Sequence, residues 1–275
     1  MKKLIKILII MCMLLQMFGC KARTEKSSGL YIEFLSTGKS DCAIIQADEL
    51  NIICDTAYEW NYSQIEERLK VLGIVSIDVM ILTHFDKDHI GSAGHIINEI
   101  DVETVYMPDY EEESEEYESL MLEIEKSGTK AKRLTERAEI GFANGKLIID
   151  PPDVSKYDDD NNRSIITVIE YESVGILLAG DARKKRLEEF TDENGYGSYD
   201  LIKLPHHGDY TKSLQKILEN AGTKYGIITC EASKESVEEN LINALETNGA
   251  EAIYTSDGSV AFTYERGSLT KTEPK

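Results

Sequence analysis

Three apolar runs in this sequence each end in a turn that carries histidine or aspartate. The first run ends at Thr83 and is followed by HFDKDH at 84–89; the second leads into Gly180-Asp181 and the third into His206-His207. Short apolar runs bounded by turn residues are typical of buried strands. Open α/β sheets place their ligand sites at the carboxyl ends of strands. The sequence therefore favours an α/β fold in which three strand ends present polar side chains.

The hexapeptide at 84–89 places two imidazoles and two carboxylates at positions i, i+2, i+4 and i+5. In a short turn between a strand and a helix, these side chains can converge on one point, where a multivalent cation would stabilise them. Without a cation, Asp86 and Asp88 would raise one another's pKa and destabilise the fold. An exposed charged loop explains the isolated hexapeptide equally well, and the other two strand ends decide in favour of a metal site. His95, in the following helix, is expected to be structural.

The rest of the chain alternates strand-like runs with amphipathic helical segments, with no internal repeat and no long linker. This pattern predicts one mixed α/β domain over residues 30–275. The predicted strands are 31–35, 42–46, 51–55, 79–83, 104–107, 146–150, 165–171, 175–179, 201–204, 225–229, 252–255 and 260–263. The predicted helices are 62–72, 92–99, 114–126, 184–190, 213–220 and 237–247.

The net charge of −20 over 275 residues bears on the choice of partner. The electric field of such a charge repels polyanions, so high-affinity binding of nucleic acid by the body of the protein is not expected. A metal site can still bind a phosphodiester. Solubility is the simpler explanation of the charge. The acidic run at 109–118 is predicted to be the solvated start of a helix. Cys42 and Cys54 are predicted to be buried thiols, and the sequence has no CxxC metal motif.

The first 19 residues, MKKLIKILIIMCMLLQMFG, combine a lysine-rich start with an apolar stretch too short to span a bilayer comfortably. This pattern predicts a secretory signal. It ends at Gly19-Cys20, which resembles a bacterial lipoprotein cleavage site, so Cys20 is the predicted lipidation site and residues 20–29 form a tether. Simple cleavage and a retained anchor are the alternatives. The protein is expected to be exported, either to the outer face of the cell membrane as a lipoprotein or in secreted form.

Six short motifs occur along the chain in the order GKSDCAII (38–45), ICDT (53–56), THFDKDHIG (83–91), NNRS (161–164), LAGD (178–181) and LPHHG (204–208). This ordered set resembles the metallo-β-lactamase superfamily, and specifically the hydrolase domain at the end of the DNA-uptake protein ComEC. The resemblance covers essentially residue 30 to the C-terminus. It implies a single-domain αββα sandwich with two divalent metal ions at one edge.

The resemblance also implies roles for individual residues. The implied metal ligands are His84 and Asp86 for the first ion, Asp88, His89 and His206 for the second, and Asp181 between the two ions. A hydroxide on the ions would be the nucleophile, because the cations lower its pKa. Asp88 and His207 are the implied catalytic residues. His207 would bind the substrate or protonate the leaving group, and packing beside His206 as a helper is the alternative role.

Other residues are expected to support this centre. Asp55 would orient the metal-binding loop through a hydrogen bond. The further histidine that the family usually has before Asp181 is absent, and Asn162 is the candidate for a supporting oxygen in that region; a half-empty first site is the alternative. Arg163 and Lys203 flank the site in the sequence and are candidates for contacting a phosphate. Because carboxylates replace imidazoles, the site favours Mn²⁺ or Mg²⁺ more than a histidine-rich site does, and zinc or manganese is expected.

These features together predict an exported metal-dependent hydrolase of phosphodiesters, with extracellular DNA or a cell-wall polymer as the substrate. A lipid anchor would hold it on the membrane, and no protein partner is predicted. Hydrolysis of β-lactams or other acyl compounds is one alternative, which nitrocefin turnover would reveal. A non-catalytic surface lipoprotein of the same fold is another alternative, which a lack of bound metal would favour.

Overall fold

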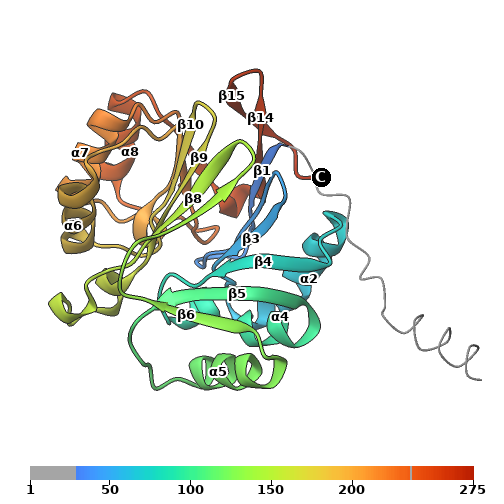
Figure 1. Ribbon diagram of the computed structural model, residues 1–275. Helices are drawn as coiled ribbons and strands as arrows, with labels where there is room; N and C mark the ends of the chain where they lie inside the picture. Colours follow the sequence, from blue (N-terminus) through green and yellow to red (C-terminus); the bar gives the residue numbers. More distant parts are fainter. Residues whose placement is uncertain (1–28, 236) are drawn as a thin grey trace, which may run out of the picture.

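Two β-sheets pack face to face, and helices cover the outer face of each sheet (Figure 1). The structure is a computed structural model that describes residues 29–235 and 237–275. Apolar side chains from both sheets fill the space between them, including Ile45 and Ile81 from one sheet and Ile149 and Ile176 from the other. This αββα arrangement confirms the fold class that the sequence predicted.

The first sheet has eight strands in the order β15-β14-β1-β2-β3-β4-β5-β6. Strands β3 to β6 run parallel, and the remaining neighbours pair antiparallel. The outer face packs against three helices. The bounds are β1 (Leu30–Phe34), β2 (Ala43–Ala47), β3 (Leu50–Cys54), β4 (Ser76–Ile81), β5 (Asp101–Pro108), β6 (Lys130–Leu134), β14 (Val260–Glu265) and β15 (Ser268–Thr272), with helices α2 (Tyr62–Val71), α4 (Ala93–Glu99) and α5 (Glu115–Ser127).

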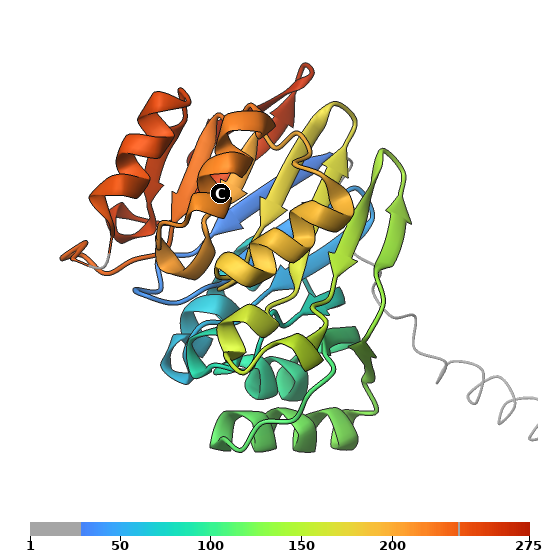
Figure 2. The ribbon, with the colours of Figure 1, turned by 90° about the vertical axis from the view of Figure 1, so that its left-hand side faces the viewer.

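The second sheet has seven strands in the order β13-β12-β11-β10-β9-β8-β7. Strands β10 to β13 run parallel, whereas β7 to β10 pair antiparallel. Figure 2 looks onto the three helices that cover this sheet. The bounds are β7 (Ala138–Phe142), β8 (Gly145–Asp150), β9 (Ile166–Tyr171), β10 (Val174–Leu178), β11 (Leu201–Lys203), β12 (Tyr225–Ile228) and β13 (Glu251–Tyr254), with helices α6 (Lys184–Asn194), α7 (Lys212–Ala221) and α8 (Glu239–Thr247).

The central strands are apolar on both faces because each sheet is buried on both sides. In β4, Val79 and Ile81 face the second sheet, while Met80 points to the helices on the outside. A strand alternates its side chains between two faces, so a strand in this position needs a continuous apolar run. Such runs are the signal by which the sequence analysis found most of the strands.

Helices α5 and α7 show how local sequence sets the outer layers. Ser114 caps α5 by accepting a hydrogen bond from the Tyr117 amide (3.2 Å), and glutamates fill the first helical turn. The acidic run at 109–118 is thus the solvated helix start that the sequence predicted. Thr211 caps α7 in the same way, accepting from the Leu214 amide at 3.0 Å. A side-chain cap of this kind stabilises a helix by about 1 kcal/mol.

Three strands were missed by the sequence analysis, and all three lie at an edge of a sheet: β6, β7 and β15. Their sequences are KAKRL, AEIGF and SLTKT, and they are largely exposed. An edge strand faces solvent on one side and carries charged residues that discourage pairing with other chains. Edge strands of this kind therefore lack the apolar runs from which buried strands are predicted.

Several other expectations concern the chain ends and the cysteines. Cys42, Cys54 and Cys230 are buried free thiols, which confirms the prediction for the first two. The predicted signal, Cys20 and nearly all of the tether lie outside the described residues. In the described part of the chain, no helix combines the length and apolar character needed to cross a bilayer.

The topology brings the predicted site together at one end of the sandwich. Strands β3 and β4 are parallel neighbours in the first sheet, and β10 and β11 are parallel neighbours in the second. The turns at their carboxyl ends carry the polar residues singled out in the sequence. Short helices complete this end of the molecule: α3 (Lys87–Ile90), η1 (Glu59–Asn61), η2 (Val154–Lys156), η3 (Asp160–Arg163), η4 (Pro205–His207) and η5 (Thr255–Asp257).

Candidate metal centre

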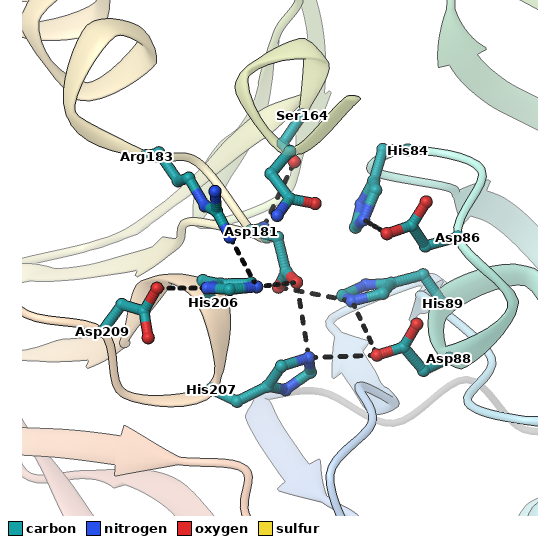
Figure 3. Close-up of polar contacts among 12 residues, drawn as sticks. His84, Asp86, Asp88, His89, Ser164, Asp181, Arg183, His206, His207 and Asp209 are labelled. Atoms are coloured by element: carbon teal, nitrogen blue, oxygen red, sulfur yellow. Dashed lines mark hydrogen bonds and ion pairs between the residues drawn. The ribbon is translucent and has the colours of Figure 1, made fainter. Parts of the chain in front are cut away.

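The loop after β4 presents the first group of candidate ligands. His84 follows the strand directly and is fully buried, and the short helix α3 carries Asp88 and His89. Asp86 occupies the position before this helix in an extended conformation, and its carbonyl accepts a hydrogen bond from the His89 amide (2.9 Å). This tight turn directs His84, Asp88 and His89 toward one point (Figure 3). Asp86 lies farther out, half-exposed, with Oδ2 3.5 Å from Nε2 of His84.

The second sheet supplies the other half of the cluster. Asp181 follows β10, and His207 follows β11. Asp181 Oδ1 lies 3.3 Å from Nε2 of His89, and Asp181 Oδ2 lies 3.3 Å from Nε2 of His207. The His207 Nε2 atom also lies 3.2 Å from Oδ2 of Asp88. Asp181 thus stands between the imidazoles of the two sheets, as Figure 3 shows.

Three buried polar atoms in this cluster have no hydrogen-bond partner: Nε2 of His84, Nε2 of His89 and Oδ1 of Asp181. Unpaired buried polar atoms are rare and destabilising, so their concentration at one point requires an explanation. Imidazole nitrogens and carboxylate oxygens are the usual protein ligands of divalent metals. The sets whose ligand atoms lie within 4.8 Å of one another include His84–His89–Asp181 and Asp88–His89–His207. The donor set therefore fits bound metal ions.

The ligands from the first sheet are held in the orientation that metal binding needs. Asp55, at the end of β3, accepts hydrogen bonds from His89 Nδ1, from the Thr83 amide and from the Thr83 hydroxyl, each at 2.8 Å. The Thr83 hydroxyl also lies 3.1 Å from His84 Nδ1, and because its own proton is donated to Asp55 it accepts a hydrogen bond from this nitrogen. Because the Nδ1 atoms carry the protons, the Nε2 lone pairs of both histidines face the centre. The structure thus brings Asp55 against the metal-binding loop.

His207 is held in an equivalent way from the opposite side. Its Nδ1 donates to the Thr229 hydroxyl (3.0 Å), which in turn donates to Asp41 Oδ1 (2.6 Å). Asp41 precedes β2 and is buried, and it forms an ion pair with Lys203 of β11. Asp41, Thr229 and the Lys203 ion pair were not assigned this role from the sequence, because only the packing of the two sheets brings β2 and β11 together.

The electrostatics of the cluster show that it is built for positive charge. Burial lowers the pKa of His89 and His207, but neighbouring carboxylates outweigh burial: Asp181 and Asp55 hold the His89 pKa well above its usual range, and Asp181 and Asp41 raise the His207 pKa to about 10. Burial raises the pKa of Asp181, yet the two imidazoles hold it well below its usual range. In the absence of metal, protons supply the positive charge that the carboxylates demand.

The structure exchanges the roles assigned to the two adjacent histidines. His206 was predicted to be the ligand and His207 the catalytic residue, and the positions of the two rings favour the reverse assignment. His207 is buried and reaches Asp88 and Asp181, whereas His206 Nε2 approaches Asp181 only to 3.8 Å. The His206 ring is instead held by Asp209 through Nδ1 and lies 3.4 Å from the Arg183 guanidinium. His206 therefore lines the solvent side of the centre.

The two predicted phosphate contacts, Lys203 and Arg163, are both engaged by groups of the protein itself. Lys203 is buried, and its ammonium is taken up by Asp41 and by the Gly180 carbonyl oxygen (3.1 Å). Arg163 donates from Nη1 to Asp160 (2.7 Å) and from Nε and Nη2 to the Tyr157 carbonyl (3.2 and 2.9 Å). Both cations thus stabilise internal structure. The sequence analysis missed Arg183, which follows Asp181 by two residues and reaches the rim of the centre.

An asparagine side chain does reach the centre, but it belongs to Asn161 and not to the predicted Asn162. Asn162 Oδ1 accepts from the Arg186 amide (3.1 Å), so this side chain anchors α6 and does not support a ligand. Asn161 is the asparagine that reaches the site: with its oxygen toward the donors, it accepts from His206 Nε2 at 3.2 Å and from the Arg183 guanidinium at 3.2 and 3.3 Å. Adjacent residues on the 3₁₀ helix η3 point in different directions, which the pair of identical letters did not reveal.

Backbone strain accompanies this construction. Asp55, Ala57, His206 and His207 all have positive φ angles, between 45° and 58°. Non-glycine residues in this region are uncommon, and they cluster at functional sites where the surrounding structure holds them. The two successive positive φ values at His206 and His207 turn the second ring inward and the first outward, which is why the chain order alone did not distinguish their roles.

Comparison with known proteins agrees with this geometry. The family model described as "Metallo-beta-lactamase superfamily" matches residues 35–230. ComE operon protein 3 of Bacillus subtilis is 22% identical over 161 residues, covering 58% of this chain and 21% of that protein. Recombination protein 2 of Haemophilus influenzae is 24% identical over 204 residues, covering 72% of this chain and 24% of that protein. The chain thus spans about a quarter or less of the length of these two relatives.

A solved structure shares the fold over nearly the whole described chain. Igni18, a metallo hydrolase from the archaeon Ignicoccus hospitalis, superposes with a TM-score of 0.54 at 14% identity, covering 86% of this chain and all of that one. The match of the family model spans most of the present sequence and includes every ligand of the cluster described above. From its sequence, its sandwich and its shared edge of imidazoles and carboxylates, this chain belongs to the metallo-β-lactamase superfamily.

Proposed function

We propose that the protein hydrolyses phosphodiesters. The observation that carries this proposal is a carboxylate-rich ligand cluster with an arginine at its rim. The Arg183 side chain is 43% exposed, and its guanidinium lies beside His206 and 3.4 Å from the exposed carboxylate of Asp159, an ion pair that a phosphate would replace. A guanidinium presents donors that match phosphate oxygens, and a half-exposed one is available to a ligand in solution. The relationship to ComE operon protein 3 and Recombination protein 2 is consistent with this class of substrate.

Two divalent ions would be held by the ligands described above, with Asp181 shared because its two oxygens can serve both. The first ion would be held by His84 and Asp181 with Asp86 at the rim, and the second by Asp88, His89, His207 and Asp181, since His89 has a single Nε2 lone pair to give. When bound, such ions lower the pKa of water and neutralise charge on a phosphoryl group. The mixture of carboxylates and imidazoles suits manganese or zinc.

The side chains around the cluster have distinct tasks in the proposed reaction. Arg183 binds a non-bridging oxygen of the diester and orients the phosphorus over the cluster. Asp88 is partly open to solvent and accepts a proton from the attacking water. The new P–O bond forms as the bond to the leaving oxygen breaks, and His206, oriented by Asp209, gives a proton to that leaving oxygen. His207 does not serve as this acid because its Nε2 faces the buried ligands.

Hydrolysis of bis(p-nitrophenyl) phosphate tests this function. Purified protein loaded with Mn²⁺ or Zn²⁺ should release p-nitrophenol, and a chelator should stop the reaction. Asp181→Asn should lower kcat at least about 100-fold because the shared ligand is lost. Asp257→Asn is the matched control, since Asp257 is an exposed aspartate paired with Lys234. Turnover of nitrocefin with no cleavage of the diester by the loaded protein would refute the proposal and indicate acyl hydrolysis.

We also propose that the chain is exported and anchored through a lipid on Cys20. The support is the sequence of residues 1–20 alone, with its lysine-rich start, apolar stretch and terminal cysteine. Cells that express the protein should incorporate labelled palmitate into it, and Cys20→Ser should abolish the label. Cys230→Ser, which removes a buried thiol, is the control. Unchanged labelling in Cys20→Ser would refute the anchor.

A further inference from the structure

Trp60 stands out on the surface because it is the only tryptophan in the chain and its residue is 72% exposed. Its ring stacks on Tyr58, with centroids 4.2 Å apart and planes inclined by 13°. In the part of the chain that the structure describes, Tyr58 is the only ring stacked on Trp60. One face of the indole is therefore covered and held in place, and the other face is presented to solvent. A ring that is held by stacking on one face and is open on the other presents a π surface that a ligand can contact.

This aromatic pair is attached directly to the metal-binding helix α3. The Ser92 hydroxyl donates to the Tyr58 carbonyl oxygen at 2.6 Å. At Gly91, a Cβ atom would lie 2.4 Å from the Glu59 amide nitrogen and 2.7 Å from the Tyr58 carbonyl carbon. Only a glycine permits this approach of the two backbones. The segment that carries Trp60 is therefore pressed against the turn that follows His89.

The surroundings of the pair are acidic. Glu59, between the two rings in sequence, is exposed, and its carboxylate contacts only His95 among the described residues, at 3.2 Å. Burial and then the Asp88 carboxylate raise the pKa of Tyr58, the His89 imidazole lowers it, and the Glu231 and Asp181 carboxylates raise it further. The whole chain carries a net charge of −20. This field repels a polyanion and attracts a cation, and the open face of an indole binds cations through its ring quadrupole.

We propose that Trp60, supported by Tyr58, forms a binding site for an alkylammonium group on the substrate. This inference rests on the proposed phosphodiester function and narrows it, because a diester bearing such a group is zwitterionic. The phosphate would lie over the metal centre and Arg183, and the ammonium group would lie on the indole beside Glu59. The negative charge of the protein then favours binding of this substrate, whereas it would oppose binding of a long polyanion.

The location of the tryptophan provides a direct binding assay. Choline is titrated into the metal-loaded full-length protein while the emission of Trp60 is recorded, and its uncharged isostere 3,3-dimethyl-1-butanol is titrated in parallel. Choline should give a saturable change in emission, and the isostere should give none at the same concentrations, because the interaction depends on charge. This measurement needs no catalytic activity. Equal effects of the two compounds, or no saturable effect of choline, would overturn the proposal.

Kinetics with three chromogenic diesters supply the second test. For p-nitrophenyl phosphocholine, Trp60→Ala should raise KM about tenfold with little change in kcat, and Trp60→Phe should retain part of the affinity. The KM for bis(p-nitrophenyl) phosphate should rise much less. Val75→Ala, which shortens another exposed apolar side chain, should leave both KM values unchanged. A rise in KM confined to thymidine 5′-p-nitrophenyl phosphate would show that the indole stacks a base, and would overturn the proposal.

The outcomes separate this inference from the function on which it rests. Metal-dependent cleavage of bis(p-nitrophenyl) phosphate with no effect of Trp60→Ala on phosphocholine ester hydrolysis would leave the phosphodiesterase standing and remove the ammonium site. Charge-dependent choline binding without cleavage of any diester would support the ammonium site and refute the phosphodiesterase. Circular dichroism and a thermal unfolding curve for each Trp60 variant establish that it is folded.

Discussion

Removal of metal should make the stability of this protein fall as pH rises from 6.5 to 10. In the metal-free cluster, His207 lies 3.3 Å from Asp41 on one side of its ring and 3.3 Å from Asp181 on the other. Burial lowers its pKa, but these carboxylates outweigh burial and raise the pKa from 6.5 to about 10. A group whose pKa is higher in the folded state stabilises that state fully below its unfolded pKa. This stabilisation is lost as pH rises through the folded value.

The expected size of the effect follows from the two pKa values. The pKa of His207 rises from 6.5 in the unfolded chain to about 10 in the folded protein. At about 1.4 kcal/mol for each unit of pKa, protonation of His207 contributes about 5 kcal/mol to the free energy of unfolding. The lowered pKa of Asp181 and the raised pKa of His207 arise from the same attraction between the two side chains, so its free energy is counted only once. A domain is typically stable by about 5–15 kcal/mol, so this loss would be a large part of the total. A bound divalent ion replaces the proton, and the loaded protein should change little over the same range.

Urea unfolding at a series of pH values measures this directly. The midpoint for chelator-treated protein should fall between pH 6.5 and 10, and it should stay nearly constant for protein loaded with manganese or zinc. His207→Gln should reduce the slope, while the raised pKa of His89 leaves part of it in place. His95→Gln should keep the full slope, because His95 is exposed and lies outside the cluster. A metal-free midpoint that is flat with pH, or an undiminished slope in His207→Gln, would refute the reasoning.

Three further predictions concern single residues. His207→Ala should lose about one bound metal per chain, whereas His206→Ala should keep both and lower kcat about 100-fold; elemental analysis beside kinetics checks this, and the opposite pattern would restore the original assignment. Lys203→Met leaves a buried carboxylate unpaired and should destabilise the protein by about 3–5 kcal/mol; a urea midpoint within error of wild type would contradict the ion pair's role. Gly91→Ala forces a Cβ to within 2.4 Å of the Glu59 amide nitrogen and should cost about 1–3 kcal/mol in thermal unfolding, which a wild-type Tm would disprove.

The sequence was sufficient for most of the sandwich because its central strands are buried on both faces. Runs such as Ile176–Ala179 have no polar residue, and a strand with such a run is expected in a sheet that is covered on both faces. The edges carry no such signal. The sequence of β6, KAKRL, does not itself favour a strand. The segment is extended because it pairs with β5, and this pairing cannot be read from its own residues.

The candidate site was predictable to the extent that it is local. The turn at 84–89 places its ligands by sequence spacing, and Asp181 could be found because it ends an apolar run. The choice between His206 and His207 depended on two unusual φ angles, which the letters do not report. Asp41 depended on how the two sheets meet, because it contacts His207 of the other sheet, and Arg183 depended on the turn after β11, which places His206 beside it.

The division of the ligands between two sheets has a consequence for how the active protein comes into being. One set follows β4 and the other follows β10 and β11, and the first sheet itself is completed by the last strands of the chain, β14 and β15, beside β1. The centre therefore forms only after β10 and β11 have been added to the chain and the two sheets have packed together, and metal binding is coupled to that step of folding. The ion in the finished enzyme is then chosen by the metal supply of the compartment in which folding ends. If the chain is exported as we propose, that supply lies outside the cytoplasm.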